Sequence, residues 1–390
     1  MRTCDLAPAR LRQSVAALGL AAALLTGGPV AAQVTPAAGY TPPDDTPTIK
    51  VGAVIFADYT FQQKPSATDA DGNSIKSSAF NVARSYINVS GNISHLVSYR
   101  ITPDITRESG TGSSLNGSLT FRLKYAYAQV NLDDWLPKGT FIRFGIQQTP
   151  FIDFLESIYR YRFQGTVFPE REGYIASADA GVTFRTQFPR NYGDVHVGVY
   201  NGENYNKAEA NDQKAWMIRA SVRPLPMHPL LRGWRVTGFY IADHYIKSAE
   251  KRRAILNTTF EHKHLNAGFD YLDTKDQPSA KTGTRNLHGN GWSVFAVPKL
   301  PDTDNGSSWE VFLRYDHMKP NDEVTVVGGG GTGAGLGTNE RTIAGLAYWF
   351  PKQGSVSAAL MVDVENVTFS DYTPARPTQQ RIFLHSLISF

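Results

Sequence analysis

The chain ends in an aromatic residue, Phe390, which closes an unbroken alternating segment. This segment, Arg381–Phe390, contains no glycine or proline and has no polar tail behind it. A strand that alternates to a terminal aromatic, on a chain that begins with an export signal, is typical of bacterial outer-membrane β-barrels. The segment therefore predicts that one face of each strand meets lipid, so that periodicity, aromatic residues and loops have to be interpreted against a bilayer.

Residues 1–32 have the composition of a signal for export through the Sec pathway. Three arginines precede the apolar stretch Val15–Leu25, and the small residues at 30–32 offer a cleavage site before Gln33. This stretch is too short for a membrane anchor, and no later one approaches ~18 apolar residues, so helical membrane spans are excluded. Cleavage would remove Cys4, the only cysteine, and with it any disulfide or thiolate metal site.

Composition alone would suggest a soluble protein. Hydrophobic residues make up 41% of the chain and the mean hydropathy is −0.30. The mean hydropathy does not reveal a membrane barrel, because each lipid-facing residue of its strands is followed by one that faces the lumen. The 18 Tyr and 21 Phe would suit its two interfacial girdles. After removal of the signal the chain is nearly neutral, which gives no sign of a nucleic-acid partner.

Segments with a period of two recur along the whole chain after a short Pro-rich lead, residues 33–48. The predicted strands are Ile49–Phe61, Phe80–Ser90, His95–Ile105, Leu119–Leu132, Thr140–Gln148, Ala178–Phe188, Asp194–Asn201, Ala215–Pro224, Trp234–Tyr245, Ala254–His262, Leu265–Asp273, Gly291–Val297, Ser308–His317, Arg341–Phe350, Val356–Phe369 and Arg381–Phe390. We expect residues 49–390 to form one all-β domain, a transmembrane antiparallel barrel of about sixteen strands. Its short and long connectors alternate, as periplasmic turns and external loops require.

The faces of the strands predict which side chains line the lumen. Between residues 120 and 128, one face carries Phe121, Leu123, Tyr125 and Tyr127, and the other carries Thr120, Arg122, Lys124 and Ala126. A charge on the lipid face would cost ~2–4 kcal/mol at mid-bilayer, so the basic face should look inward. By the same reasoning the predicted pore-lining cations of the strands are Arg84, Arg100, Arg122, Lys124, Arg143, Arg185 and Arg219.

Inward acids gather in the second half of the sequence, with Glu310 and Asp316 on one strand and Asp363 and Glu365 on another. A basic wall would then face a more acidic one across a water-filled lumen. Such a field favours the passage of anions. The alternatives are general diffusion with weak selectivity, and lumen charges that only pair for stability. Inward aromatic residues, represented by Tyr86, Tyr200 and Phe312, are too few for a sugar-stacking pore.

The longest connector, residues 149–177, is the third long loop and is rich in Phe, Ile and Tyr. An apolar loop of this size needs a surface to pack on, so we expect it to fold into the lumen and narrow it. Arg160, Arg162 and Arg171 would then face the channel. Asp153, Glu156, Glu170 and Glu172 lie in the same loop and could neutralise them. The alternative is a helical cap over the barrel mouth or against a neighbouring subunit.

Three stretches in this region resemble successive signatures of the phosphate-selective porin O and P family. They are Ile142–Phe151, Asp179–Val182 and Val199–Asn206, and the resemblance is clearest between residues 120 and 225. The resemblance implies a trimeric outer-membrane porin whose third loop folds into the lumen, with basic residues guiding small anionic solutes. The motifs do not specify which solute is selected.

Other chemistry is weakly represented. The Gly-rich stretch 328–337 lacks the Gly-Lys-Ser/Thr ending of a phosphate-binding loop, and the pair His262 and His264 lacks a third metal ligand nearby. No cofactor or metal is expected, and no Gly-x-Ser-x-Gly nucleophile motif occurs. The rival classes are an outer-membrane enzyme and a structural barrel with a filled lumen. A receptor of about 22 strands would need a longer chain.

Overall fold

The computed structural model describes residues 45–110, 112–247, 249–277, 287–301, 303, 306–322 and 337–390. The expected signal peptide, with Cys4, and most of the Pro-rich lead lie outside these residues. The same holds for nearly all of the Gly-rich stretch 328–337. None of the described helices is both long and apolar enough to cross a membrane.

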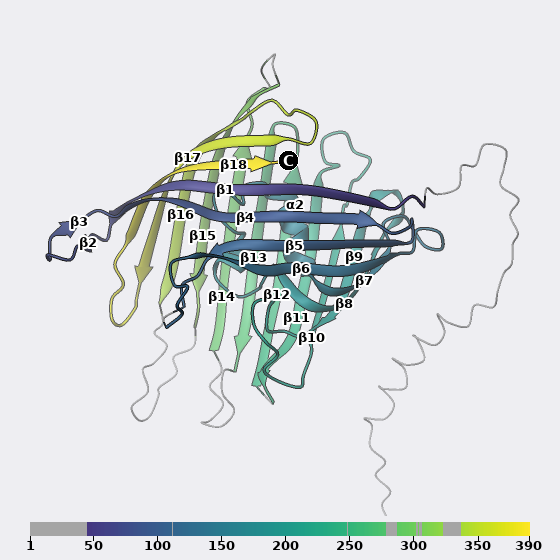
Figure 1. Cartoon of the computed structure of the whole chain (residues 1–390), viewed down its shortest axis with the longest axis horizontal. Coiled ribbons are helices and arrows are strands. Elements are labelled where there is room, and N and C mark those ends of the chain that lie inside the picture. Colours follow the sequence, from purple (N-terminus) through teal and green to yellow (C-terminus); the bar gives the residue numbers. More distant parts are fainter. Residues whose placement is uncertain are drawn as a thin grey trace, which may run out of the picture. The chain divides into compact units, whose positions relative to one another are not determined.

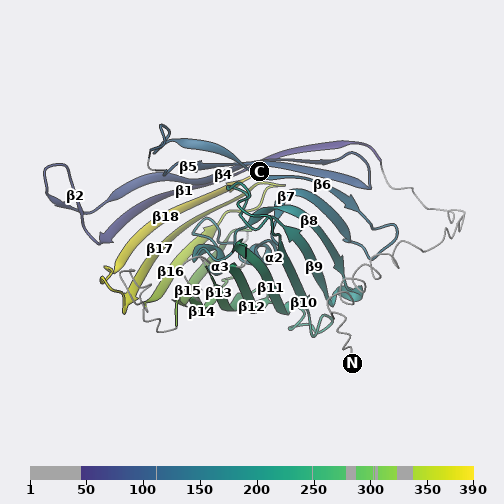
Figure 2. The same cartoon turned by 90° about the horizontal axis from the view of Figure 1, so that it is seen from below.

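Sixteen antiparallel strands form a closed barrel, which confirms the predicted fold class. Its strands are β1 (Thr48–Lys64), β4 (Ser78–Asn92), β5 (Val97–Arg107), β6 (Leu119–Asn131), β7 (Phe141–Gln148), β8 (Ala178–Gln187), β9 (Gly193–Tyr200), β10 (Ala215–Val222), β11 (Trp234–Ile246), β12 (Ala249–Glu261), β13 (Leu265–Asp276), β14 (Leu287–Pro298), β15 (Ser308–Lys319), β16 (Thr338–Trp349), β17 (Ser357–Ser370) and β18 (Gln379–Ser389). Neighbours in sequence are neighbours in the sheet, as Figures 1 and 2 show. The topology therefore needs no crossover.

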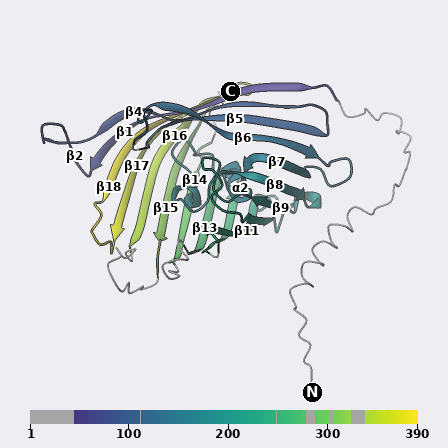
Figure 3. The same ribbon diagram turned by 60° about the horizontal axis from the view of Figure 1, so that its bottom comes forward.

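The terminal aromatic residue completes the closure of the barrel. β1 pairs with β4 on one side and with β18 on the other, and these strands lie side by side in Figure 3. Phe390 N donates to Ala53 O at 3.0 Å, and Ala53 N donates to Phe390 O at 2.9 Å. The last residue of the chain thus continues the ladder between the first and last strands, and the part of β1 before it, Thr48–Gly52, pairs with β4.

The alternation of the strands separates an apolar exposed face from a polar buried one. On β10, Trp216 is 65% exposed, whereas Arg219 on the other face is 2% exposed. On β7, Phe144 is 71% exposed and Arg143 is 8% exposed. Because the barrel is closed, the buried face is the inner one. An outer surface of Phe, Trp, Leu and Val around a charged interior is the arrangement that a barrel in lipid requires.

One predicted face is wrong. Tyr125 and Tyr127 were expected beside Phe121 and Leu123 on the lipid face, but the β5–β6 register shifts between Leu123 and Tyr125. Lys124 is the extra residue of this bulge, and after it Tyr125 lies opposite Thr102 on the inner face. A bulge of one residue exchanges the faces of all that follows. Ala126 is turned outward by the same shift.

The connectors differ from the expectation in two places. β11 extends to Ile246 and β12 already begins at Ala249. The stretch 246–253, expected as a connector, is therefore mostly strand. The first long connector contains a small hairpin, β2 (Ala67–Thr68) and β3 (Ser74–Ile75). Short connectors still gather at the rim that holds the N-terminal end of β1 and the C-terminal end of β18, because each strand is antiparallel to the next. The 3-10 turn η1 (Pro189–Asn191) is one of them.

Candidate functional site

The third long loop carries two helices, α2 (Pro150–Ile158) and α3 (Phe168–Arg171). α2 begins with a proline, whose missing N–H costs nothing at the first turn of a helix. Its buried residues include Phe151 and Leu155, and the ring of Phe151 stacks on Phe239 of β11 at a centroid distance of 5.3 Å. Apolar residues of α2 therefore contact buried residues of the barrel strands.

Polar contacts fix the loop to the wall beyond α2. Glu310 of β15 accepts a hydrogen bond from Arg160 Nη2 at 3.0 Å and another from the Tyr161 hydroxyl at 2.6 Å. Arg314 of the same strand donates from Nη1 to Thr166 O at 2.8 Å and to the Tyr159 hydroxyl at 3.0 Å. These contacts join residues that are about 150 positions apart in the sequence. The loop is thus anchored at several points along one strand.

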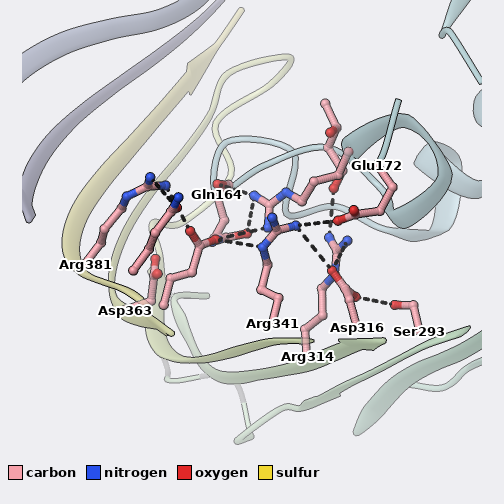
Figure 4. A network of polar contacts seen from close by, with 12 residues as sticks. Gln164, Glu172, Ser293, Arg314, Asp316, Arg341, Asp363 and Arg381 are labelled. Carbon is pink, nitrogen blue, oxygen red and sulfur yellow. Dashed lines mark hydrogen bonds and ion pairs between the residues drawn. The ribbon is translucent and has the colours of Figure 1, made fainter. Parts of the chain in front are cut away.

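A network of alternating charges surrounds the second half of the loop (Figure 4). Glu365 of β17 forms ion pairs with Arg171 of the loop at 3.3 Å, with Arg341 of β16 at 3.6 Å and with Arg381 of β18 at 3.3 Å. Arg341 also lies 3.1 Å from Glu172. Each charge therefore has opposite charges as neighbours, and the network compensates for the desolvation that burial imposes on it.

A second cluster joins the loop to β4 and β6, which lie beyond β1 from the strands of the first network. Arg162 pairs with Glu156 at 2.7 Å and lies 3.8 Å from Glu170. Burial raises the pKa of Glu156 to about 7, although Arg162 opposes this shift. Burial also acts to raise the pKa of Glu170, but Arg162 and Lys124 outweigh it and the pKa is lowered. The two loop carboxyls thus differ, and Glu170 is the one that stays ionised near neutral pH.

Three cations meet at one phenol in this cluster. The Tyr86 hydroxyl lies 3.3 Å from Arg84 Nη1, 3.4 Å from Lys124 Nζ and 3.5 Å from Arg162 Nη2. A hydroxyl oxygen has two lone pairs, so it cannot accept a full hydrogen bond from all three donors. Positive charge is thus concentrated around a neutral group, and within the described part of the chain only the Arg162 member of this group pairs with the carboxylates of Glu156 and Glu170.

The ten predicted cations fall into two groups. Within the described residues, ion pairs to carboxylates are made by Arg122 (to Asp104), Arg160 (to Glu310), Arg162 (to Glu156), Arg171 (to Glu365), and Arg185 and Arg219 (both to Asp194). Arg84, Arg100, Lys124 and Arg143 form none there. Arg100 donates to Asn88 and Thr102, and Arg143 donates to Gln129 and Gln148. These four side chains come from β4, β5, β6 and β7, which are consecutive in the barrel.

Aromatic rings accompany the cations. Arg100 lies over Tyr125 at 4.7 Å from the centroid, and Arg143 lies over Tyr127 at 4.2 Å and over Phe141 at 4.5 Å. The bulge at Lys124 makes two of these contacts possible, because it turns both tyrosines inward. Interior aromatic residues are thus more numerous than expected, with Phe56, Phe239 and Phe295 among those that are buried.

The expected division into a basic and an acidic wall is incomplete. Glu310, Asp316, Asp363 and Glu365 are buried on the inner face, as predicted. The same half also holds cations that were not predicted, which are Arg253, Arg314, Arg341 and Arg381, and the first half holds the acids Asp104 and Asp194. Most of these residues lie two positions along a strand from another inner-face residue. The alternation rule would therefore have placed them on the inner face.

Two cavities border the loop. One of about 410 Å³ is lined by β1, β4, β5 and β18 together with residues 162–166 of the loop. Another of about 620 Å³ lies at the rim of short turns, where Arg160, Arg232, Lys263 and Lys299 line it. Each is large enough for a small hydrated solute.

Comparison with known proteins identifies the fold. No family model matches the sequence, and no curated protein does. Among solved structures, the outer membrane channel DcaP of Acinetobacter baumannii is similar with a TM-score of 0.55 and 11% identity, covering 88% of this chain and 97% of that chain. OmpF of Salmonella typhi, in complex with daunomycin, has a TM-score of 0.54 and 12% identity, covering 87% of this chain and 97% of that chain. An OmpT variant of Vibrio cholerae lacking loop L8 has a TM-score of 0.56 and 11% identity, covering 89% of this chain and 100% of that chain.

Identities this low establish a shared fold and nothing finer. The barrel of this chain is built like those of outer-membrane proteins, and its interior joins buried ion pairs to a set of cations held only by neutral groups. Within the described part of the chain, no three His, Cys, Asp or Glu residues are arranged to hold a metal ion. The site thus combines buried ion pairs with four cations that hydrogen-bond to neutral groups.

Proposed function

We propose that this protein is an outer-membrane porin through which small hydrophilic solutes diffuse passively, with a preference for anions. The observation that carries the anion preference is the row of Arg84, Arg100, Lys124 and Arg143, which hydrogen-bond to neutral partners. A guanidinium without a carboxylate partner keeps its full charge for a passing ion, whereas an ion pair largely cancels it. The fold shared with an outer membrane channel supports a pore in that membrane.

In this proposal the third long loop lies in the lumen and sets its width. Its hydrogen bonds to inner-face side chains, such as Glu310 and Arg314, support that position. The subunits would assemble as homotrimers, and a similar barrel, OmpT of Vibrio cholerae, is described in a trimer form. Membership of the phosphate-selective porin O and P family remains a prediction from the sequence. The function is one of passage, without a reaction.

A salt-gradient measurement tests the proposal directly. Mature protein inserted into a planar bilayer between unequal KCl solutions should give stepwise conductance and a reversal potential of the sign that chloride selectivity produces. A reversal potential near zero would instead favour a general porin with weak selectivity. Absence of conductance steps would favour a structural or enzymatic barrel.

Glu156 should make the selectivity depend on pH. Its folded-state pKa of about 7 lies above the ordinary 4.5 because of burial, so ionisation of Glu156 opposes folding and this cost grows as pH rises from about 4.5 to about 7. Below pH 7 the protonated carboxyl no longer cancels Arg162. We expect the anion-to-cation permeability ratio to rise about threefold between pH 8 and pH 5, since one charge near the path is worth ~0.7 kcal/mol.

The variant Glu156→Gln separates this effect from the titration of other carboxyls. Glutamine keeps the volume and hydrogen-bonding capacity of the protonated acid, so the variant should show the high ratio already at pH 8. Its ratio should change little down to pH 5. A variant that still follows the wild-type pH curve would exclude Glu156 as the cause.

A further inference from the structure

The cavity of about 410 Å³ combines two kinds of surface. Hydrogen-bond donors come from Arg84 of β4 and from Arg162 and Gln164 of the loop. Aromatic rings come from Phe163 of the loop and from Phe56 and Phe383 of the wall. Small-molecule sites in proteins are typically ~300–1,000 Å³ and combine an apolar lining with a few converging polar groups. This cavity has both properties.

Two N–H groups at this cavity have no acceptor among the described residues. Gln164 is 6% exposed, and its Nε2 has no hydrogen-bond partner among the described residues, while its Oε1 accepts from Arg171. Arg162 Nε is likewise buried and without a partner there. A buried donor left unsatisfied costs ~1–3 kcal/mol, so native proteins rarely retain one without a use. Two such donors at one cavity, beside Arg84, indicate an acceptor that is brought by a ligand.

The rings define the remainder of that ligand. Phe383 stacks on His385 at 4.9 Å, and Phe163 meets the same imidazole edge to face at 6.4 Å. These side chains form an aromatic corner on the wall of the cavity. An inorganic anion would satisfy the donors but would not use the aromatic part of the cavity wall, whereas an apolar ring on the ligand would pack against it.

The charges that face the cavity favour a single negative group. Asp58 also lines it, and its carboxylate accepts from Thr60 Oγ1 at 2.8 Å and from Asn81 Nδ2 at 3.1 Å. A ligand that carried a second carboxylate would meet this fixed negative charge. A ligand with one carboxylate can direct it to Arg84 and Gln164 and keep its ring on the phenylalanines.

We propose that this cavity is a binding station for monocarboxylates that carry an aromatic ring, on the path of the solute. The inference rests on the proposed function and names a class of solute for it. The carboxylate is held by Arg84, Gln164 and Arg162, and the ring lies against Phe163 and Phe383. The station lies where the loop faces β1, β4 and β18, apart from the second cavity at the rim of short turns.

Block of the ion current in planar bilayers tests this station, with benzoate as probe and acetate and benzyl alcohol as comparisons. Benzoate should reduce the chloride current at a half-blocking concentration about tenfold below that of acetate, because only benzoate covers the rings. Benzyl alcohol, which lacks the charge, should also be weaker. Equal half-blocking concentrations for benzoate and acetate would overturn the inference and leave the porin proposal intact.

Variants assign the contacts. Gln164→Leu and Arg84→Met should each raise the half-blocking concentration of benzoate about fivefold, and Phe163→Leu should bring benzoate close to acetate. Arg84 lies on a strand, so a disordered loop cannot explain its effect. Lys263→Gln, which removes a charge at the second cavity, should leave the benzoate block unchanged. If Gln164→Leu and Arg84→Met both behave like wild type, the station is wrong.

Titration calorimetry of the detergent-solubilised protein with benzoate gives a readout that does not need conduction. Heat of binding for benzoate that is absent for acetate, and lost in Arg84→Met, would support the station even if the channel did not conduct. In that case the porin proposal alone would be wrong. Absence of benzoate heat in a conducting protein would overturn the station alone.

Discussion

Replacing Asp316 by asparagine is expected to lower the free energy of unfolding by ~3–5 kcal/mol. Asp316 is 1% exposed and accepts from Arg314 Nε and Nη2, each at 2.8 Å, and from Ser293 Oγ at 2.7 Å. It also lies 3.7 Å from Arg341. Asparagine keeps the size of the side chain but leaves the Arg314 guanidinium buried without its carboxylate. Urea unfolding of the detergent-folded barrel, followed by tryptophan fluorescence, would measure the loss.

Two further variants show whether burial of the ion pair is the reason for the large loss of stability in Asp316→Asn. Asp273 pairs with His288, but its side chain is 43% exposed, so Asp273→Asn should cost at most ~1 kcal/mol. Replacing Arg314 and Asp316 together by Met and Leu should recover much of the stability, because no uncompensated charge remains. Equal losses for Asp316→Asn and Asp273→Asn would contradict the role given to the buried pair.

The sequence predicted the barrel well because membrane strands repeat a simple local rule. Alternation placed Arg143 and Arg219 on the inner face correctly, and the terminal aromatic residue indicated the closing strand. Alternation failed at Lys124, where the register with β5 shifts. A bulge depends on the pairing of two strands, and the pattern within 120–128 carries no trace of it.

The sequence predicted on which face of a strand a charged side chain lies better than it predicted the partner of that side chain. Arg122 was expected among the pore-lining cations, and it forms an ion pair with Asp104 of the neighbouring strand at 3.0 Å. Asp104 belongs to a strand that the sequence had identified, but only the register brings the two side chains opposite each other. Contacts of the loop with Glu310 and Glu365 join residues 150 or more positions apart, which no local pattern reports. The candidate site was thus predicted as a set of residues, and its electrostatics came from the fold.

Replacing Arg100 and Arg143 together by glutamine should lower the anion-to-cation permeability ratio about three- to tenfold. A charge ~6 Å from a passing ion contributes ~0.7 kcal/mol in a water-like medium, so two such charges approach a factor of ten. Salt screens this contribution, since the Debye length is ~8 Å at physiological ionic strength. Both side chains hydrogen-bond to neutral groups, so their loss leaves no carboxylate without its partner. Reversal potentials in a KCl gradient at low salt give the ratio.

The control for the Arg100 and Arg143 variant is a second double variant that removes both members of an ion pair. Arg122→Gln combined with Asp104→Asn deletes one positive and one negative group that lie 3.0 Å apart, so the net charge of the wall stays the same. This variant should keep the wild-type ratio to within about a factor of two, because the field of a close pair falls off quickly with distance. A fall as large as that of the Arg100 and Arg143 variant would mean that selectivity follows the number of arginines in the wall. An unchanged ratio in both variants would place the selective step elsewhere, at the arginines of the loop.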